Sequence, residues 1–281
     1  MRKFLIQLWF FGFWGLVIFP VLVFAQAESW KTDHDQGLQA YSYGDLAGAE
    51  RLFLRALKEA ERSGAEDMRV ATVLDSLAQV YFGQGRYAET EPLLRRSLAI
   101  WEKVLGPEHP NAATALDNLA DLYLKQKKFR EAEPLLKRAL AIWEKSLGPD
   151  NPNLIQRINT LANISYGQGH YAEAEKLYRR ALIIQEKVFG PDHLEAAKTV
   201  DFLAVLCTVQ GKYAEAEPLH RRALAAREKA LGPNHPEVAA SLENYAILLR
   251  KTNRKAEAEK LEARAKLIRL QQIHDSSRTG N

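Results

Sequence analysis

Three histidines hold equivalent places along the chain, because His109, His193 and His235 are separated by multiples of 42 residues. Imidazole nitrogens are common zinc ligands, so a recurring histidine is a candidate for metal chemistry. Zinc–nitrogen bonds are about 2 Å long, whereas successive structural units are offset by about a helix diameter, ~10 Å. The three side chains therefore cannot share one ion, and we expect each to cap the helix that follows it.

No other group of residues forms a recognisable catalytic or cofactor site. The sequence has no phosphate-binding glycine loop and no H-E-x-x-H motif, and no serine or cysteine nucleophile has a positioned partner. Its single cysteine, Cys207, falls on an apolar helical face, where we expect a buried free thiol. The sequence therefore predicts a protein that is not an enzyme and has neither a metal nor a cofactor.

The remaining polar residues lie in a sequence that repeats itself at a fixed interval. The dipeptide Gly-Pro occurs at 106/107, 148/149, 190/191 and 232/233, always 42 residues apart, and related segments such as QGRY at 84–87 keep the same register. Self-similarity at such a period is typical of a solenoid, in which each repeat buries its apolar face by stacking on its neighbours.

Each repeat contains two amphipathic helices, since apolar residues such as Leu116, Leu119, Ala120 and Tyr123 recur at helical spacing. The turn between the two helices carries a residue that must adopt a left-handed conformation, which glycine does without steric cost. This position is held by Gly85, Gly169 and Gly211, by Asn253 as the next best choice, and by Lys127, which we expect to strain its turn slightly.

These residues resemble the tetratricopeptide repeat (TPR) family, and the 42-residue period is similar to the repeats of kinesin light chains. Leu74, Leu77, Ala78 and Tyr81 stand where the family's first-helix packing residues stand. The resemblance covers about residues 31–270 and six helix pairs. It implies an all-α TPR solenoid with a right-handed superhelix that acts as a scaffold for protein interactions.

The solenoid is expected over residues 28–273, and its last helix is expected to close it. Ala258, Leu261, Ala265 and Ile268 form one apolar stripe, while charged residues keep the other face in water. Residues 274–281 show no apolar periodicity, so we expect a flexible tail there.

The N-terminus is typical of a secretory leader. Arg2 and Lys3 precede an uncharged run over 4–24, and Ala25-Gln26-Ala27 forms a cleavage site that would make Glu28 the first mature residue. The alternative is an uncleaved membrane anchor, because the run is long enough to span a bilayer. Both alternatives place the repeats outside the cytoplasm, in the periplasm or secreted in the first case and anchored by residues 4–24 in the second.

The charge of the chain does not indicate nucleic-acid binding. Removal of residues 1–27 would take away two basic residues and lower the formal net charge from +4 to +2. Pairs of basic residues do recur along the second helices, but acids lie one turn earlier, which favours a solvated face of salt bridges. These pairs are Arg95/Arg96, Lys137/Arg138, Arg179/Arg180 and Arg221/Arg222.

The resemblance implies a concave surface lined by first-helix positions beside the packing residues, and we call it the first-helix surface. Its residues are rich in carboxylates and amides, which suit the backbone and the basic side chains of an extended peptide. The alternative is that they are merely solvated. The candidate partner-binding residues are Asp75, Gln79, Phe82, Asp117, Asn118, Asp121, Asn159, Asn163, Tyr166, Asp201, Glu243 and Asn244.

Two functions follow from these observations. The first is a non-enzymatic scaffold, exported from the cytoplasm, that binds a protein or peptide partner with a basic segment and contacts the membrane only through an uncleaved N-terminus. The second is a structural spacer or self-assembling repeat array of the cell envelope. The equivalent residues Trp101 and Trp143 could form an aromatic ledge, although packing against the adjoining loop is the commoner use of large helical aromatics.

Overall fold

The computed structural model describes residues 29–62 and 64–279, so the leader predicted over residues 1–27 lies outside the described part. Every regular element in the described residues is a helix and none is a strand, which confirms the all-α prediction. None of these helices is both long and apolar enough to cross a membrane.

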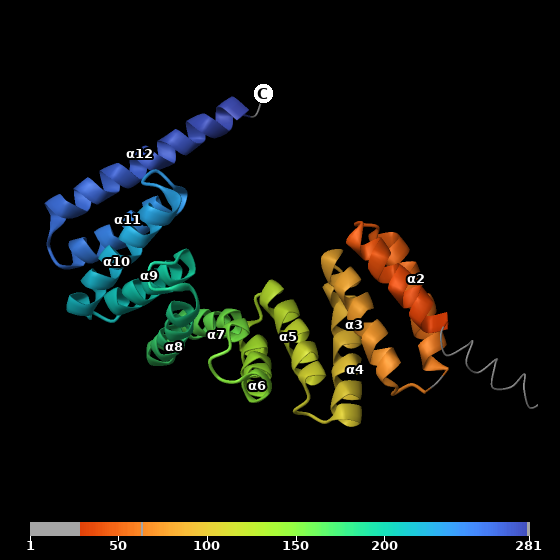
Figure 1. The fold of residues 1–281 in the computed structure, drawn as a ribbon. Coiled ribbons are helices and arrows are strands. Elements are labelled where there is room, and N and C mark those ends of the chain that lie inside the picture. The colour runs from red at the N-terminus through yellow and green to blue at the C-terminus, as the bar shows by residue number, and fades with distance from the viewer. Residues whose placement is uncertain (1–28, 63, 280–281) are drawn as a thin grey trace, which may run out of the picture. The chain divides into compact units, whose positions relative to one another are not determined.

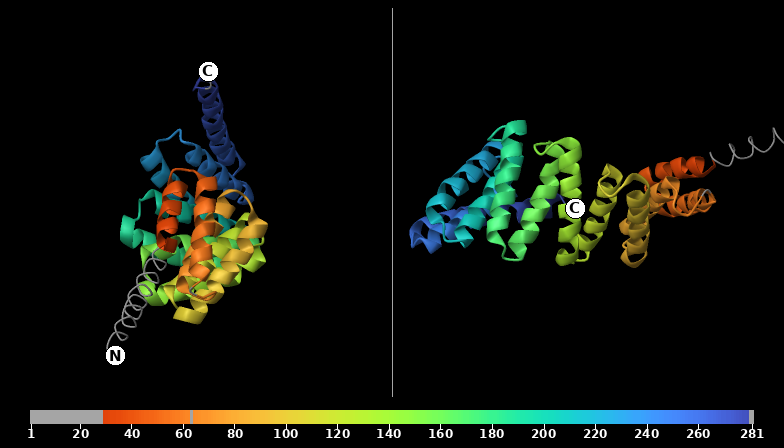
Figure 2. Two further views of the ribbon diagram at one scale, coloured as in Figure 1. Left: turned by 90° about the vertical axis from the view of Figure 1, so that its right-hand side faces the viewer. Right: turned by 90° about the horizontal axis from the view of Figure 1, so that it is seen from below.

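The described helices form six successive pairs, each joined by a short turn (Figure 1, Figure 2). The first pair consists of the helix over 29–42 and α2. In the later pairs α3, α5, α7, α9 and α11 are first helices, and the even-numbered helices are second helices. The bounds are Leu46–Glu61 for α2, Met68–Gly83 for α3, Tyr87–Leu105 for α4, Pro110–Lys125 for α5, Phe129–Leu147 for α6, Pro152–Leu154 for the short 3₁₀ helix η1, Ile155–Gly167 for α7, Tyr171–Phe189 for α8, Leu194–Val209 for α9, Tyr213–Leu231 for α10, Pro236–Lys251 for α11 and Lys255–Thr279 for α12.

The chain divides after Ile142 into two compact units, an N-terminal half and a C-terminal half. Within each half, the two helices of a pair pack on one another, as α3 and α4 or α9 and α10 do. Second helices also pack on the first helix of the following pair. Contacts are therefore made between neighbours along the chain, as a stacked solenoid requires. The predicted right-handed superhelix stays a prediction.

The helix starts use the capping residues that the sequence predicts. In His109, His193 and His235 the Nδ1 atom accepts a hydrogen bond from the backbone N–H two residues later, at 3.1, 3.2 and 3.2 Å. Asn151 fills the equivalent place before η1, and its Oδ1 accepts from the Asn153 N–H at 2.9 Å. Each cap satisfies one of the backbone donors that the first turn of a helix leaves without a partner. No group of three or more potential metal ligands occurs among the described residues.

The turn within each pair has the predicted left-handed residue. The φ angles are 75° at Gly85, 80° at Gly169 and 76° at Gly211, and the non-glycine residues Lys127 and Asn253 adopt 59° and 62°. These are the two positive-φ residues other than glycine in the described part of the chain. The backbone of the repeat therefore imposes this conformation even where the side chain disfavours it.

The predicted first-helix packing residues are buried in the core, together with apolar residues of the second helices. Leu116 and Ala120 are fully buried in α5, and Leu203, Ala204 and Cys207 are fully buried in α9. Burial raises the pKa of the Cys207 thiol to about 11, so this cysteine is a packing residue rather than a reactive nucleophile. In α12 the stripe residues Ala258, Ala265 and Ile268 are buried, and the helix continues to Thr279. The predicted flexibility of residues 274–281 stays a prediction.

The paired basic residues of the second helices have two different roles. The first residue of each pair forms the predicted ion pair with the acid four residues earlier, for example Lys137 with Glu133 at 2.7 Å. The second residue instead reaches the preceding repeat. Arg138 donates to the Glu102 carboxylate at 2.6 Å and to the Pro107 carbonyl oxygen at 3.1 Å. The same two-part contact is made by Arg96, Arg180, Arg222 and Arg264.

Candidate protein-binding surface

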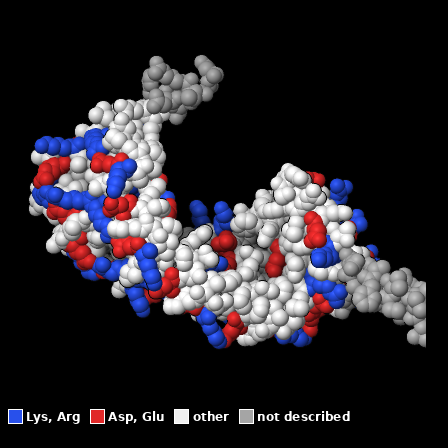
Figure 3. All heavy atoms as spheres, viewed as in Figure 1, with Lys and Arg blue, Asp and Glu red and all other residues white. Residues whose placement is uncertain are grey.

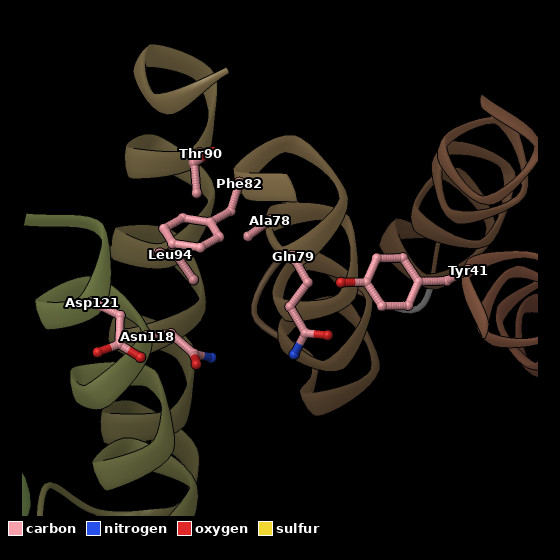
Figure 4. A pocket seen from close by; sticks show the side chains of 8 residues that line it. All are labelled: Tyr41, Ala78, Gln79, Phe82, Thr90, Leu94, Asn118 and Asp121. Carbon is pink, nitrogen blue, oxygen red and sulfur yellow. The ribbon is translucent and has the colours of Figure 1, made fainter. Parts of the chain in front are cut away.

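Four of the six candidate residues of the N-terminal half meet at one cavity. It has a volume of about 220 Å³ and lies between the helix over 29–42, α3, α4 and α5. Four of the predicted binding residues line it, and the remaining lining residues come from the helices on either side (Figure 4). The full set is Tyr41, Ala78, Gln79, Phe82, Thr90, Leu94, Asn118 and Asp121.

This first cavity combines polar groups with apolar walls. The Tyr41 hydroxyl points toward the Gln79 side chain, which comes from a different helix, and Asn118 and Asp121 lie on the other side of Gln79 (Figure 4). The Phe82 ring is held by a tilted contact with Tyr87, with 5.7 Å between the ring centroids. A carboxylate, two amides and aromatic surface are suited to an extended chain whose backbone needs both donors and acceptors.

Two of the six candidate residues of the C-terminal half line a second cavity, of about 580 Å³, formed by η1, α7, α8 and the start of α9. The predicted residues Asn159 and Asn163 line it. Asn163 is exposed, and its Oδ1 accepts a hydrogen bond from the Tyr178 hydroxyl. Burial raises the pKa of Tyr178 to about 12, so the hydroxyl remains a donor and fixes the Asn163 amide.

The other eight lining residues were not predicted, and two of them, Gln185 and Glu195, carry polar side chains that bear on the site. Gln185 of α8 is only 1% exposed, and Glu195 lies in the first turn of α9. The oxygens Gln185 Oε1 and Asn159 Oδ1 are both buried and accept no hydrogen bond from any described residue. An amide inside an apolar helix face carries no motif, so periodicity alone did not identify Gln185. The sequence feature that could have identified Gln185 is its place in the repeat, because it occupies the same position as Trp101 and Trp143 in earlier repeats.

Comparison of the sequence with models of known protein families identifies the family of the repeats. A tetratricopeptide repeat model matches residues 69–145, 118–182, 154–208 and 195–266. The chain belongs to the tetratricopeptide repeat family. No curated protein matches it.

Solved TPR structures share this fold. The putative kinesin light chain repeats of Podospora anserina are 27% identical to this chain and give a TM-score of 0.61. The match covers 72% of this chain and 95% of the Podospora chain. BtubC (BKLC) from P. vanneervenii is 23% identical, covers 84% and 93% of the two chains, and gives a TM-score of 0.62. YrrB, described as a TPR protein with an unusual peptide-binding site, is 15% identical with a TM-score of 0.54, and covers 76% and 92%. The predicted similarity to kinesin light chain repeats is thereby confirmed.

Six predicted residues of this TPR protein line neither cavity. Asp75 accepts a hydrogen bond from Trp101 Nε1 at 2.9 Å, and burial raises the pKa of its carboxyl. Trp101, which is 6% exposed, therefore packs into the solenoid and forms no exposed ledge. Glu243 pairs with Arg269 at 3.1 Å, and the Tyr166 ring contacts Tyr171. The others are Asp117, which is half-buried, Asp201 and Asn244.

Asp201 is part of a buried polar network that the sequence did not predict. It is 6% exposed, and its Oδ2 accepts from Arg227 Nη1 at 2.7 Å and from Asn244 Nδ2 at 3.2 Å. His220 Nδ1 lies 3.9 Å from its other oxygen. Because both Asp201 and Asn244 serve this internal network, we leave them out of the proposed binding surface. Burial of a complete ion pair depends on tertiary packing, which the first-helix pattern did not contain.

The electrostatic character of the two cavities follows from where the basic residues lie. None of the residues lining either cavity is Lys or Arg. On the face of α9 to α12 that Figure 3 shows, basic and acidic side chains lie side by side and form no patch of one sign. The second basic residue of each second-helix pair is engaged by an acid and a carbonyl oxygen of the preceding repeat. The side chains that line the cavities include acceptors but no base, and Lys198 pairs with the lining residue Glu195 at 2.8 Å.

Proposed function

We propose that this TPR protein is a non-enzymatic scaffold whose first-helix surface binds an extended, basic segment of a partner protein. TPR proteins generally bind proteins or peptides. Here we add that the first-helix surface is the face that binds and that the bound segment is positively charged. The observation that carries it is the pair of cavities, which are lined by carboxylates and amides and by no basic residue. A cationic segment gains attraction from the carboxylates there and meets no basic lining residue.

The test uses labelled peptides of equal length in which Ser and Gly alternate with Arg, Lys, Glu or Ala. We expect fluorescence anisotropy to show that the Arg and Lys peptides bind, and that binding weakens as salt rises, since exposed charges are screened over about 8 Å at 0.15 M. Asp121→Lys should weaken binding about tenfold, because it replaces an attraction at the first cavity with a repulsion.

The matched control is Glu131→Lys, which makes the same charge change at an exposed position of the second helix α6, outside the lining residues. It should leave the affinity within about twofold of the unaltered protein. Equal binding of the Glu and Arg peptides, or an equal loss in both variants, would contradict the proposed surface.

We also propose that the protein is exported. The support is the leader pattern over residues 1–27, with Arg2 and Lys3 before the apolar run and small residues at Ala25 and Ala27. Mass spectrometry of the chain from the exported fraction should give Glu28 as its first residue. An intact N-terminus in the membrane pellet would select the anchor instead, and a full-length cytosolic chain would overturn both.

A self-assembling array is the second candidate, and one observation favours it. The far part of α12 exposes Leu267, Leu270 and Ile273, with relative exposures of 62%, 51% and 68%. An exposed apolar stripe of this kind is suited to contact with a second surface. Sedimentation velocity distinguishes the candidates, because an array should shift to larger species with concentration and lose them in Leu267→Glu/Leu270→Glu, whereas a scaffold should stay one species.

A further inference from the structure

The 42-residue period places one second-helix position opposite one first-helix position in every repeat. Trp101, Gln185 and Arg227 share the second-helix position, and Asp75, Asn159 and Asp201 lie 26 residues before them on first helices. In two of these repeats the second-helix residue is a donor and the first-helix residue is its acceptor. Trp101 Nε1 donates to Asp75 at 2.9 Å, and Arg227 Nη1 donates to Asp201 at 2.7 Å.

The pair Asn159 and Gln185 breaks this pattern. Neither Asn159 Oδ1 nor Gln185 Oε1 accepts a hydrogen bond from a described residue, although both atoms are buried. The Gln185 side chain is 1% exposed, and both residues line the second cavity. Buried polar groups in native proteins almost always have a partner, so two unpaired acceptors on residues that line one cavity indicate that something outside the described chain supplies the donors.

The repeat that follows indicates what that donor is. There the Arg227 guanidinium is 7% exposed and is held by Asp201, by Ser241 Oγ and by Glu237, whose Oε2 lies 3.7 Å from Nε. One repeat earlier, the places of Asp201 and Glu237 are taken by Asn159 and Glu195, and both line the second cavity. The acceptors are kept, but the arginine has been replaced by a shorter and neutral glutamine.

We infer that the second cavity takes the guanidinium of an arginine side chain from a partner, in the place that Arg227 fills one repeat later. A guanidinium presents five donors in a planar fork, which can serve several oxygens of different residues at once. Phe189 at the cavity wall is 45% exposed, and its ring already stacks on His193 with 4.8 Å between the ring centroids. An ammonium group, which is a compact point charge, matches the spread of acceptors less well.

The cavity's size and charge agree with this ligand. Its volume of about 580 Å³ falls within the range of about 300–1,000 Å³ that is usual for ligand sites. Its one charged lining residue is Glu195, which pairs with Lys198 at 2.8 Å in the same helix. An anionic ligand would find no basic side chain among the lining residues. The inference rests on the proposed function, because it assigns one side chain of the bound segment to one site.

The test uses the full solenoid and a blocked arginine, N-acetyl-arginine N-methylamide, with blocked citrulline and blocked lysine as comparisons. Side-chain amide signals in ¹H–¹⁵N NMR report directly on Asn159 and Gln185. We expect the arginine derivative to shift both signals saturably in the millimolar range, and citrulline, which has nearly the same shape without the charge, to bind at least tenfold more weakly.

Two variants make the assignment specific. Gln185→Arg fills the cavity from within and should abolish the saturable shift of Asn159, while Ile183→Arg adds the same charge at a 64% exposed position of the same helix and should leave it unchanged. Asn159→Asp recreates the acceptor of the next repeat and should tighten arginine binding at least threefold. Equal binding of arginine and citrulline, or binding that survives Gln185→Arg, would overturn the inference.

Failure of this site can be separated from failure of the proposed function. If the basic peptides bind and respond to Asp121→Lys, but blocked arginine leaves Asn159 and Gln185 unshifted, the arginine site is wrong and the binding surface stands. If blocked arginine binds as described but no basic peptide does, the site stands and the proposed surface is wrong.

Discussion

Lys127 holds a backbone conformation that the other repeats assign to glycine. Its φ is 59°, and a left-handed conformation costs a residue with a Cβ about 1–2 kcal/mol. Glycine avoids this cost, but it loses more backbone conformational entropy on folding, which offsets part of the gain. We expect Lys127→Gly to stabilise the protein by about 0.5–1 kcal/mol in urea unfolding. Asn253→Gly should gain less, because asparagine tolerates this conformation better. A loss of stability in Lys127→Gly would contradict this account of the turn.

His220 gives the stability a defined dependence on pH. Its side chain is fully buried, its Nε2 lies 3.1 Å from Thr208 Oγ1, and it stacks on Tyr245. Burial lowers its pKa from 6.5 to about 4, and the nearby Asp201 carboxylate only partly offsets this. Between these two values the unfolded chain binds a proton that the folded chain does not.

The contribution of His220 to stability is therefore complete above pH 6.5 and is lost as the pH falls toward about 4. The full loss is on the order of 3 kcal/mol. Urea unfolding at several pH values should show this slope, and His220→Gln should reduce it. His170→Gln, at an exposed position, is the control and should keep the slope. A slope that His220→Gln leaves unchanged would assign the dependence to other groups.

Some of the residues described above were predictable from the sequence and others were not. The histidine caps and left-handed turns were, because their chemistry depends on neighbours only a few residues away. The unpartnered Gln185 and the buried pair of Asp201 with Arg227 were not, since their environment is set by side chains 26 residues away, on the other helix of the same pair. Four predicted residues do meet at the first cavity and two at the second, because the helical period fixes the face on which they lie.

At the scale of the helix, small residues allow the stacking. Ala120 of α5 is fully buried in a first helix that packs on α4. We expect Ala120→Arg to destabilise the protein by on the order of 3 kcal/mol or more, because it buries an unpaired charge and overfills the contact. The matched control, Ala99→Arg at an exposed position of α4, should change stability by less than about 0.5 kcal/mol. Circular-dichroism melts that are the same for both variants would contradict the assigned helix face.

The order and type of the helices followed from the sequence because each repeat carries its own stops and starts. Gly106 adopts φ 93° and ψ 154°, a conformation that is essentially restricted to glycine, and the proline after it prevents continuation of α4. The same Gly-Pro step recurs with each repeat. The contacts between repeats were less predictable. The sequence predicted that Arg138 and its equivalents pair with acids one turn earlier in the same helix, whereas in the structure they pair with acids of the preceding repeat.

At the scale of the whole molecule, the arginine contacts are the regular link between repeats. Arg222 joins α10 to Glu186 of α8 and to the Pro191 carbonyl oxygen at 2.9 Å. Because a solenoid repeat contacts only its neighbours, a defect at one link should spread little along the chain. Such a half-exposed ion pair contributes up to about 1 kcal/mol, which corresponds to exchange rates up to about fivefold faster.

We therefore expect Arg222→Met to accelerate amide hydrogen exchange in α8, α10 and the loop between α8 and α9, and to leave the helices of the N-terminal half unchanged. Lys198→Met is the matched control, because Lys198 pairs with Glu195 within its own helix, and it should affect α9 alone. Hydrogen exchange followed by mass spectrometry resolves these segments. If Arg222→Met accelerated exchange equally in every described helix, the chain would unfold as one cooperative body, and the repeats would not be independent units linked through their neighbours.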